Sequence, residues 1–485
     1  MNQTTVSGST ALAPDDVLIA IDIGGSKFIT GLIDTAGNIL YSERREWLGV
    51  SQDEVQQQIV DGLRDTRAKE PELFARARAG GVTIPGFADP VRGTWIESDF
   101  LKIKNFPLCD ILKAEFGIPF FADNDCNACA LAEQYFGSAR DSRDFLYLTV
   151  STGIGGAVVL NEKLYYGAFN HAGEIGLCIM EKAGFASDSG IPGVLEAQAS
   201  GRGLVQNFLA CGGRPEIDGA VPDGRILARL ADEGDTAALE ALELEGRYLG
   251  RAIGDICNIL TPQKVVLGGG ISLLFPQYGA ALRREFERVC PLRHTEILST
   301  QLGYMGAFLG AGALALRGLR GLLPARAKDA KKDALVLSWE ARGLHCDVLW
   351  DGESYCAANP QAGNIGGYIV ADGIAENGQP LCSLFAPSVL KERVPALRGA
   401  SEESIPDALV MLAENGDQDA QCALAEFGRA LGRAAAFACV ILDPGEVVLK
   451  GTLGRALPQI WAEMKHALDA ETYYHGNLPF TVYAS

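Results

Sequence analysis

Apolar stretches separated by glycine-rich turns mark the beginning of the chain. Val17 to Ile23 is apolar except for Asp22, and Gly24-Gly25-Ser26 follows it. A second apolar stretch, Phe28 to Ile33, comes next, so the pattern predicts a hairpin with a tight turn. The following expected elements are a polar helix at Asp53 to Lys69 and strands at Gly81 to Pro85 and Pro119 to Ala122.

Strands and helices continue to alternate in the middle of the chain. Asn124-Asp125 opens an expected helix that runs to about Tyr135. Further expected elements are strands at Phe145 to Val150, Ala157 to Leu160 and Lys264 to Leu267, a long helix at about Asp235 to Leu260 and an Ala/Gly-rich helix at Gly303 to Leu316. This mixture predicts an α/β fold.

An internal repeat is the most informative feature of the organisation. The segment Leu164 to Gly176, LYYGAFNHAGEIG, aligns without gaps with SYCAANPQAGNIG, which begins at Ser354. The segment GRYLGRAIGDICNILTPQKVVLGGG from Gly246 aligns in the same way with GRALGRAAAFACVILDPGEVVLKGT from Gly428. We therefore predict a duplication whose second copy has no counterpart of residues 17–140.

Length and composition suggest how the chain divides. Its 485 residues, 48% of them hydrophobic, suffice for two or three buried cores. Residues 318–333 are basic and weakly periodic, which is typical of a linker. We expect a disordered tail at 1–16, an N-terminal lobe at 17–140, a C-terminal lobe at 141–317, the linker at 318–333 and a degenerate copy of the C-terminal lobe at 334–485.

Charge and cysteine usage exclude some functions. A net charge of −19 argues against binding nucleic acid or an anionic membrane surface. No apolar run approaches the roughly 20 residues that span a bilayer, and the beginning of the chain does not resemble a signal peptide. We expect a cytoplasmic protein with reduced thiols. Cys126 and Cys129 form a CxxC on an Ala-rich helix without a second pair, which favours helix packing over zinc binding.

Two candidate sites lie in the first 140 residues. A strand-ending carboxylate can orient Mg²⁺ through water, and neighbouring glycines let backbone amides approach a phosphate. The residues concerned are Asp22, Gly24, Gly25, Ser26 and Lys27. Asn124-Asp125 places a second carboxylate at a helix N-terminus, where it can accept a proton from a substrate hydroxyl. A plain hairpin turn and a helix N-cap are the structural alternatives.

Two further glycine-rich turns follow buried strands. Thr152 and Gly153 belong to the segment STGIGG and fit a second phosphate clamp. Gly268, Gly269 and Gly270 would let a nucleotide lie against the backbone. Ordinary tight turns remain the alternative for both.

The order of these segments is more specific than any one of them. It resembles the actin-like (ribonuclease H-like) sugar kinases, in which two α/β lobes close over ATP and a sugar. Within that group the blocks DIGGSKFITGLID, VTIPGFAD, ADNDCNACALAE, HAGEIG and VLEAQASGRGL resemble the ROK family (repressor, open reading frame, kinase) over residues 17–317. The resemblance implies ATP-dependent phosphorylation of a hexose or hexose derivative, with ATP and Mg²⁺ required.

The resemblance also implies roles for single residues. Asp125 would be the general base and Asn124 a sugar contact. Glu174 and Glu196 would bind sugar hydroxyls, because each carboxylate can accept two strong hydrogen bonds. Asn105 is a further candidate sugar contact. The alternative for each glutamate is a solvated surface position.

Two departures from the family pattern bear on metal and substrate. Many ROK proteins place a zinc-binding histidine directly after AGEIG, where this chain has Leu177. The usual cysteine cluster before the VLE block is also missing from Gly184 to Val194. We therefore expect no structural zinc and interpret His171 as a pocket-wall residue. The identity of the sugar stays open.

The second copy lacks the candidate chemistry. Glu174 corresponds to Asn364, the glycine triplet to Lys450-Gly451-Thr452, and the STGIGG turn to residues 341–346. Positions typical of packing, such as Gly363 and Gly428, are retained. We hypothesise a non-catalytic lobe that packs against the chain's own C-terminal lobe and makes the protein a monomer with an internal pseudo-dimer.

A second function remains open. Some ROK members are repressors with an N-terminal helix-turn-helix, so the chain could sense a sugar without phosphorylating it. The segment before Val17 is too short for such a motif, and the acidic charge disagrees with DNA binding. The presence of Asp125 favours an enzyme.

Overall fold

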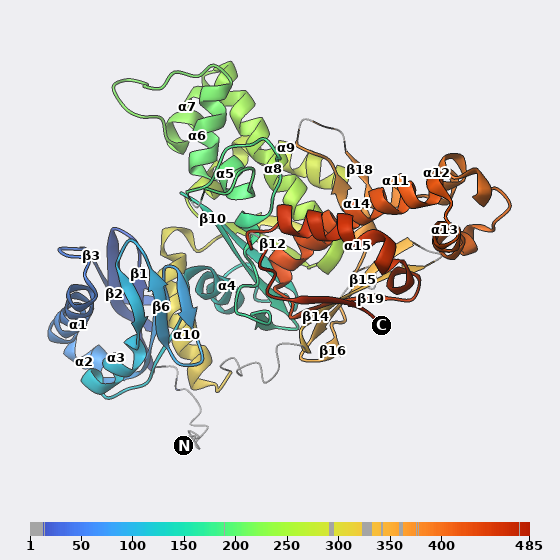
Figure 1. The fold of residues 1–485 in the computed structure, drawn as a ribbon. Coiled ribbons are helices and arrows are strands. Elements are labelled where there is room, and N and C mark those ends of the chain that lie inside the picture. The colour runs from blue at the N-terminus through green and yellow to red at the C-terminus, as the bar shows by residue number, and fades with distance from the viewer. Residues whose placement is uncertain are drawn as a thin grey trace. The chain divides into compact units, whose positions relative to one another are not determined.

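The computed structural model describes residues 13, 15–188, 190–290, 295–322, 332–340, 343–357, 362–374, 376, 378–474 and 476–485. Its chain divides into two compact units (Figure 1). The first contains Met1–Asp141 and Thr300–Lys328, and the second contains Ser142–Ser299 and Asp329–Ser485. Most of the expected tail 1–16 and of the expected linker 318–333 lies outside the described residues.

The first unit is built on a five-stranded sheet of order β3-β2-β1-β4-β8. These strands are Ile39–Glu46, Lys27–Asp34, Val17–Ile23, Ala77–Ile84 and Phe120–Asn124. The predicted hairpin is present as β1 and β2, while β4 and β8 run parallel to β1 and to each other. A smaller sheet consists of β5 (Phe87–Asp89), β6 (Thr94–Ser98) and β7 (Ile103–Phe106).

Both faces of β1 are buried, which explains its almost continuous apolar sequence. Val17, Ile19 and Ile21 belong to a core shared with α1 (Gln52–Lys69) and α3 (Leu108–Phe116). Leu18 and Ala20 belong to another core, shared with α4 (Asp125–Tyr135) and α10 (Gly306–Leu319). The short helix α2 (Pro71–Ala75) completes this unit.

Helix α10 corrects one domain boundary. We expected a helix at Gly303 to Leu316 inside the C-terminal lobe 141–317, but α10 packs on β1, β4 and α4 of the first unit. A 3-10 turn, η3 (Gly303–Met305), precedes it. The reason is close packing: a Cβ at Gly81 in β4 would lie 1.7 Å from the carbonyl oxygen of Ala311, so glycine at this position lets the helix backbone approach the sheet.

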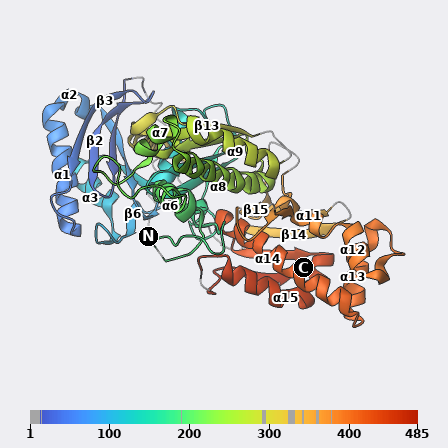
Figure 2. The same cartoon turned by 90° about the horizontal axis from the view of Figure 1, so that it is seen from above.

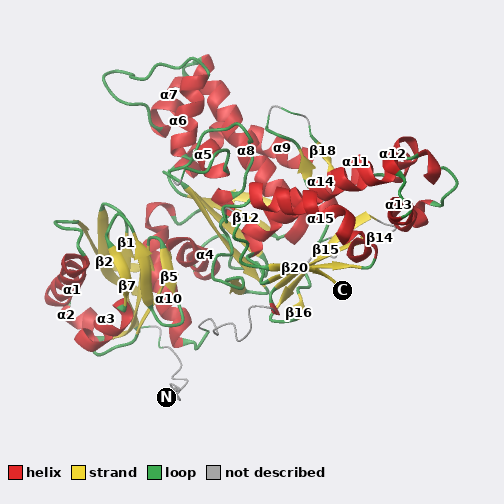
Figure 3. Cartoon of the chain, viewed as in Figure 1, coloured by secondary structure: helices red, strands yellow, loops and turns green. Residues whose placement is uncertain are grey.

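The second unit contains two five-stranded sheets. The first has the order β11-β10-β9-β12-β13, with strands Lys163–Tyr165, Ile154–Leu160, Phe145–Val150, Lys264–Gly268 and Glu296–Ser299. Its helices and 3-10 turns are η1 (Ile175–Leu177), α5 (Leu195–Ala199), α6 (Gly201–Ala210), α7 (Gly224–Asp232), α8 (Thr236–Leu260), η2 (Ile271–Leu274) and α9 (Phe275–Val289). Figure 3 distinguishes these helices, in red, from the strands, in yellow.

The second sheet of this unit has the corresponding order β16-β15-β14-β19-β20. Its strands are Glu353–Ser354, Gly343–Trp350, Ala334–Glu340, Glu446–Lys450 and Thr481–Ala484. In both sheets the second and third strands are antiparallel, and the third, fourth and fifth are parallel. The remaining elements are η5 (Ile365–Gly367), β17 (Ile369–Val370), β18 (Gln379–Pro380), α11 (Leu381–Leu384), α12 (Pro387–Arg393), η6 (Pro395–Leu397), η7 (Glu402–Ser404), α13 (Ile405–Glu414), α14 (Gln418–Leu442) and α15 (Thr452–Ala470).

Helices α8 and α14 correspond in detail. Each has 25 residues and ends at a non-glycine residue with positive φ, Thr261 at 44° and Asp443 at 45°. Figure 2 shows α8 beside α9 and α14 beside α15. Glycines allow both contacts, because a Cβ at Gly246 would meet the carbonyl oxygen of Tyr278 at 2.5 Å and one at Gly428 that of Ile460 at 2.6 Å. Within the described part of the chain, no helix is both long and apolar enough to cross a membrane.

Candidate active site

Asp22 lies at the carboxyl end of β1, where the hydroxyl of Thr83 from β4 donates a 2.7 Å hydrogen bond to Oδ1. The same hydroxyl accepts a hydrogen bond from the backbone N–H of Ile23. Burial raises the pKa of Asp22, the Thr83 bond opposes this, and the charge of Asp125 raises it further. Sequence reasoning missed Thr83; its signal was a hydroxyl next to the end of an apolar strand.

The turn after β1 keeps backbone donors available. Gly24 donates its N–H to the carbonyl oxygen of Lys27 at 2.8 Å, and the indole of Trp47 donates to the carbonyl of Gly24. The amides of Gly25 and Ser26 donate to no other described residue. Lys27 directs its ammonium over the Tyr304 ring, 4.9 Å from the centroid. Two free amides beside a carboxylate fit the predicted phosphate-binding turn.

Asn124 and Asp125 stand at the junction of β8 and α4. The Asn124 side-chain oxygen accepts the N–H of Asn127 at 2.7 Å, so Asn124 is the N-cap. Its backbone N–H donates to Asp123, whereas its side-chain nitrogen Nδ2 makes no hydrogen bond to another described residue. Asp125 is the first helical residue, and burial raises its pKa. Since β1, β4 and β8 are parallel, their carboxyl ends meet at one edge of the sheet, and this brings Asp125 near Asp22.

Asn105 lies on β7 with a positive φ of 49° and is exposed. Within the described residues it makes no hydrogen bond to Asn124 or Asp125. The structure therefore groups Asp22, Asn124 and Asp125 but adds nothing that links Asn105 to them.

In the second unit, Glu196 lies against the turn that follows β9. Its Oε2 accepts the N–H of Ile154 at 3.1 Å. A Cβ at Gly153 would lie 2.3 Å from that same oxygen, so a side chain at this position would displace the Glu196 carboxylate. Burial raises the pKa of Glu196. The turn is shorter than expected: β10 already begins at Ile154, which leaves Ser151, Thr152 and Gly153 in the turn, with Thr152 exposed.

Close backbone packing places Glu174 beside the same turn. A Cβ at Gly173 would meet the carbonyl oxygen of Gly156 at 2.7 Å, and one at Gly176 would meet that of Ile154 at 2.1 Å. The two glycines of AGEIG therefore pack directly on the first residues of β10. Glu174, between them, is half-buried at the start of η1.

The glycine triplet lies next to the end of β9. Gly268 is the last residue of β12, contrary to the expectation that the strand ends at Leu267. Gly269 has a positive φ of 82°, and a Cβ there would meet the carbonyl oxygen of Val150 at 2.3 Å. Gly270 is exposed with open space around it. Because β9 and β12 are parallel, this turn and the Thr152 turn follow neighbouring strand ends.

The segment between η1 and α5 does not fit a zinc ion. Cys178 is its only thiol, histidine is absent from it, and burial raises the pKa of Cys178 so that the thiol stays protonated. Leu177 packs instead with Ile191, Val194 and Tyr473 in an apolar cluster. Among the residues described, no group of three or more His, Cys, Asp or Glu side chains could hold a metal ion.

Comparison with known families and curated proteins gives a consistent result. The model of the ROK family matches residues 18–317. A glucokinase of Streptomyces coelicolor is 28% identical over 315 residues, which cover 61% of this chain and 96% of that protein. An N-acetylmannosamine kinase of Salmonella typhi is 32% identical over 302 residues, 61% of this chain and 97% of that protein. The regulator NagC of Escherichia coli is 26% identical over 257 residues, 52% of this chain and 63% of that protein.

Solved structures agree with the sequence comparison. A ROK hexokinase from Thermus thermophilus superimposes with a TM-score of 0.55 at 30% identity and covers 63% of this chain and 99% of its own. A glucokinase from Streptomyces griseus, solved in complex with glucose and AMPPNP, gives a TM-score of 0.54 at 26% identity and covers 62% of this chain and all of its own. The matched fold is thus the actin-like fold of sugar kinases.

Proposed function

Since the chain belongs to the ROK family, we propose that it is a sugar kinase that transfers the γ-phosphoryl group of ATP to a hydroxyl of a hexose or hexose derivative. The position and the burial of Asp125 are the observation that carries the proposal. It stands at the end of a parallel sheet, next to Asp22, with a pKa that burial raises. A carboxylate with a raised pKa is a better proton acceptor for a sugar hydroxyl than a solvated one. The kinase relatives support the same reaction class.

Residues of the first unit would handle the proton and the phosphates. Asp125 would accept the hydroxyl proton, and the side-chain nitrogen Nδ2 of Asn124 would donate to the sugar. The amides of Gly25 and Ser26 would donate to phosphate oxygens. A Mg²⁺ ion bound with ATP would neutralise phosphate charge, and Asp22 is the carboxylate that would orient its water ligands, since Mg²⁺ usually keeps several waters.

Residues of the second unit would bind the sugar and the nucleotide. Glu174 and Glu196 would accept hydrogen bonds from sugar hydroxyls, and burial of Glu196 strengthens such bonds because water competes less. Thr152 and Gly153 would contact phosphate. The exposed Gly270, with open space around it, would let the nucleotide approach the backbone.

A sugar sensor without turnover is the second candidate. The similarity to NagC supports it, because that relative is a transcriptional regulator. The two candidates predict the same sugar binding and differ only in phosphoryl transfer.

A coupled ADP-release assay over a panel of hexoses and N-acetylhexosamines tests the proposal. We expect saturable turnover with at least one sugar, and none from Asp125→Asn with that sugar. Binding of a sugar by calorimetry without ADP release from the wild type would replace the kinase by the sensor.

A further inference from the structure

The second unit consists of two halves, residues 142–299 and 332–485, each built on one of its five-stranded sheets. The segment of the first half that carries Glu174 is attached to the C-terminus of α14, a helix of the second half. Gly173 donates its N–H to the carbonyl oxygen of Ile441 at 2.8 Å, and Ala168 donates to that of Asp443 at 2.7 Å. The amides of Phe169 and His171 donate to the Asp443 carboxylate at 2.7 and 3.0 Å. Four backbone N–H groups that precede Glu174 therefore donate either to Ile441 in α14 or to Asp443, the C-cap residue of that helix.

The same contact occurs in the opposite direction at the equivalent positions. Gly363 corresponds to Gly173, and its N–H donates to the carbonyl oxygen of Ile259, the counterpart of Ile441, again at 2.8 Å. Likewise η1 contacts α14, while η5 contacts α8. This reciprocity is what an isologous contact between two copies produces. The two halves thus meet around a pseudo-two-fold axis within one chain.

The residues at the two equivalent helix caps differ. Asp443 corresponds to Thr261, and both have positive φ. The Asp443 carboxylate holds two amides of the Glu174 segment, whereas the buried Thr261 hydroxyl has no hydrogen-bond partner among the described residues. The Asp443 carboxylate therefore binds the half that keeps Glu174, while the counterparts of Phe169 and His171, at positions 359 and 361, lie outside the described residues.

A second contact holds the segment between η1 and α5. Lys182 pairs with Asp372 through its ammonium and donates its N–H to the carbonyl of that residue. When the repeat alignment is continued without gaps, these two residues are counterparts, so they meet at the pseudo-axis with opposite charges. Glu181 accepts the N–H of Ile374 at 3.0 Å.

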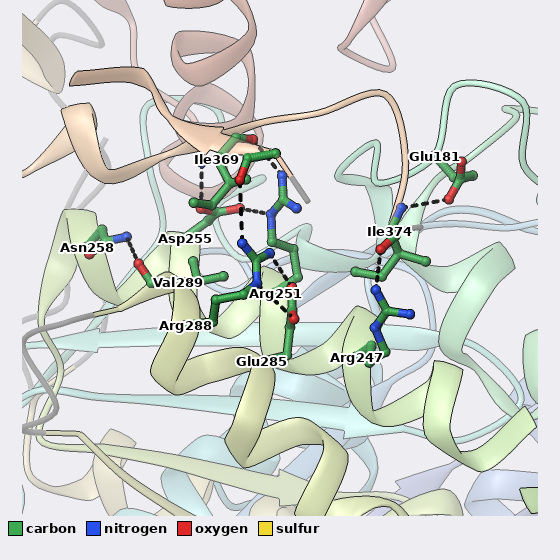
Figure 4. A network of polar contacts seen from close by, with 11 residues as sticks. Glu181, Arg247, Arg251, Asp255, Asn258, Glu285, Arg288, Val289, Ile369 and Ile374 are labelled. Atoms are coloured by element: carbon green, nitrogen blue, oxygen red, sulfur yellow. Dashed lines mark hydrogen bonds and ion pairs between the residues drawn. The ribbon is translucent and has the colours of Figure 1, made fainter. Parts of the chain in front are cut away.

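Helix α8 makes further polar contacts with residues 369–374 of the second half (Figure 4). Arg247 donates to the carbonyl oxygen of Ile374, and Arg251 to that of Ile369. Asp255 binds both the Arg251 guanidinium and the N–H of Ile369. Strand β17 and the residues that follow it to Ile374 are therefore fixed to the first half of this unit by the buried Arg251 and Asp255 and the half-buried Arg247.

We propose that residues 332–485 act as a built-in positioning partner, in which Asp443 fixes the Glu174 segment and Asp372 fixes the segment before α5. The proposal rests on the assignment of Glu174 as a sugar ligand. It also accounts for a segment without metal ligands: contacts with the second half and the apolar cluster around Leu177 hold it in place of a zinc ion. Asp443 is a positioning residue, because it acts through Glu174.

The test compares three full-length variants at two equivalent positions. Asp443→Gly removes the carboxylate, and glycine accepts the positive φ without strain. Asp443→Asn keeps an acceptor oxygen and also tolerates this backbone region. Thr261→Gly makes the matched change at the contact that faces Asn364. The measurements are amide hydrogen exchange over residues 168–174 and the KM for the sugar and for ATP.

We expect Asp443→Gly to speed exchange of this peptide and to raise the sugar KM by about tenfold or more, the size of a lost hydrogen bond to a charged group. The KM for ATP should stay within about twofold. Asp443→Asn should keep the exchange of this peptide and the sugar KM close to their wild-type values, and Thr261→Gly should change neither. The proposal would be overturned if residues 168–174 exchange equally fast in Asp443→Gly and in the wild type. It would also be overturned if Thr261→Gly changes exchange and the sugar KM as much as Asp443→Gly does.

A milder variant keeps the proposal testable if Asp443→Gly does not fold. Asp372→Asn changes a half-exposed residue and weakens its ion pairs with Lys182 and with Arg433 of α14. It should speed exchange over residues 178–188, and unchanged exchange there would overturn the proposal. If the wild type phosphorylates no sugar, the kinase assignment fails, but the exchange measurements still decide whether the second half holds these segments.

Discussion

The carboxylate of Glu196 lies against the backbone of Gly153, and one oxygen accepts the N–H of Ile154 while filling the space of an absent Cβ. This relationship couples a proposed sugar ligand to a proposed phosphate-binding turn. The φ of Gly153 is not positive, so the Glu196 carboxylate, and not the backbone conformation, favours glycine at this position. Any side chain at residue 153 has to displace the carboxylate.

Gly153→Ala should therefore impair sugar binding more than stability. The Cβ would meet the end of a flexible side chain, which can move at low cost, but its movement breaks the bond to Ile154. We expect the sugar KM to rise by about tenfold or more, as for a lost charged hydrogen bond, with a melting temperature close to that of the wild type. Gly399→Ala, where a Cβ meets nothing within 4 Å, is the control. A large loss of stability in Gly153→Ala alone would contradict the prediction.

Asp125→Asn should abolish turnover while sugar binding persists. The amide keeps the size of the side chain but cannot take the hydroxyl proton, and a general base typically contributes about 10²–10⁴-fold. Steady-state kinetics and calorimetry with the preferred sugar measure both quantities. Asp110→Asn, an exposed carboxylate on α3 of the same unit, serves as control. Near-normal turnover of Asp125→Asn would remove Asp125 from the mechanism.

The stability of the protein should depend on the ionisation of Asp443. Burial raises its pKa to about 7, hydrogen bonds from His171 and Phe169 oppose this, and Asp333 raises it further. The folded state therefore binds the proton more tightly than the unfolded state. Stability from this group is present below the unfolded pKa and is lost as pH rises towards 7. Four further titratable side chains interact electrostatically with Asp443, namely Tyr165, Tyr473, Tyr474 and Cys439.

Asp443→Asn removes this titration. The free energy of unfolding of the wild type should fall relative to that of the variant between pH 4 and 8, by at most roughly 4 kcal/mol at about 1.4 kcal/mol per pKa unit. Urea unfolding at several pH values measures the difference. Asp419→Asn, an exposed carboxylate on α14, should show no such trend. A constant difference between wild type and Asp443→Asn across this range would refute the assignment.

The purified protein should contain no stoichiometric zinc. The segment Cys178–Val194 has one protonated thiol and an apolar cluster in place of ligands. Activity should survive EDTA treatment once Mg²⁺ is restored. Metal analysis by mass spectrometry that finds about one tightly held zinc per chain would show that these residues bind metal after all.

The sequence by itself determined the local elements and the chemical candidates. The N-cap at Asn124 and the hairpin of β1 and β2 follow from interactions between residues close in the chain, so their patterns could be recognised directly. The family blocks identified Asp125, Glu174 and Glu196 by type and order. The aligned Gly246 and Gly428 indicated a retained packing position, and the structure shows that each lies where two helices approach closely.

Only the tertiary structure decided which of these residues meet. The bond from Thr83 to Asp22 depends on the register of β1 and β4, and the contact of Glu196 with Gly153 depends on the position of α5. The attachment of the Glu174 segment to Asp443 joins residues about 270 positions apart, and α10 packs on β1 and β4, which lie more than 200 positions earlier in the chain. Such contacts are set by sheet register and by the packing of buried surfaces, and no local pattern along the chain encodes them.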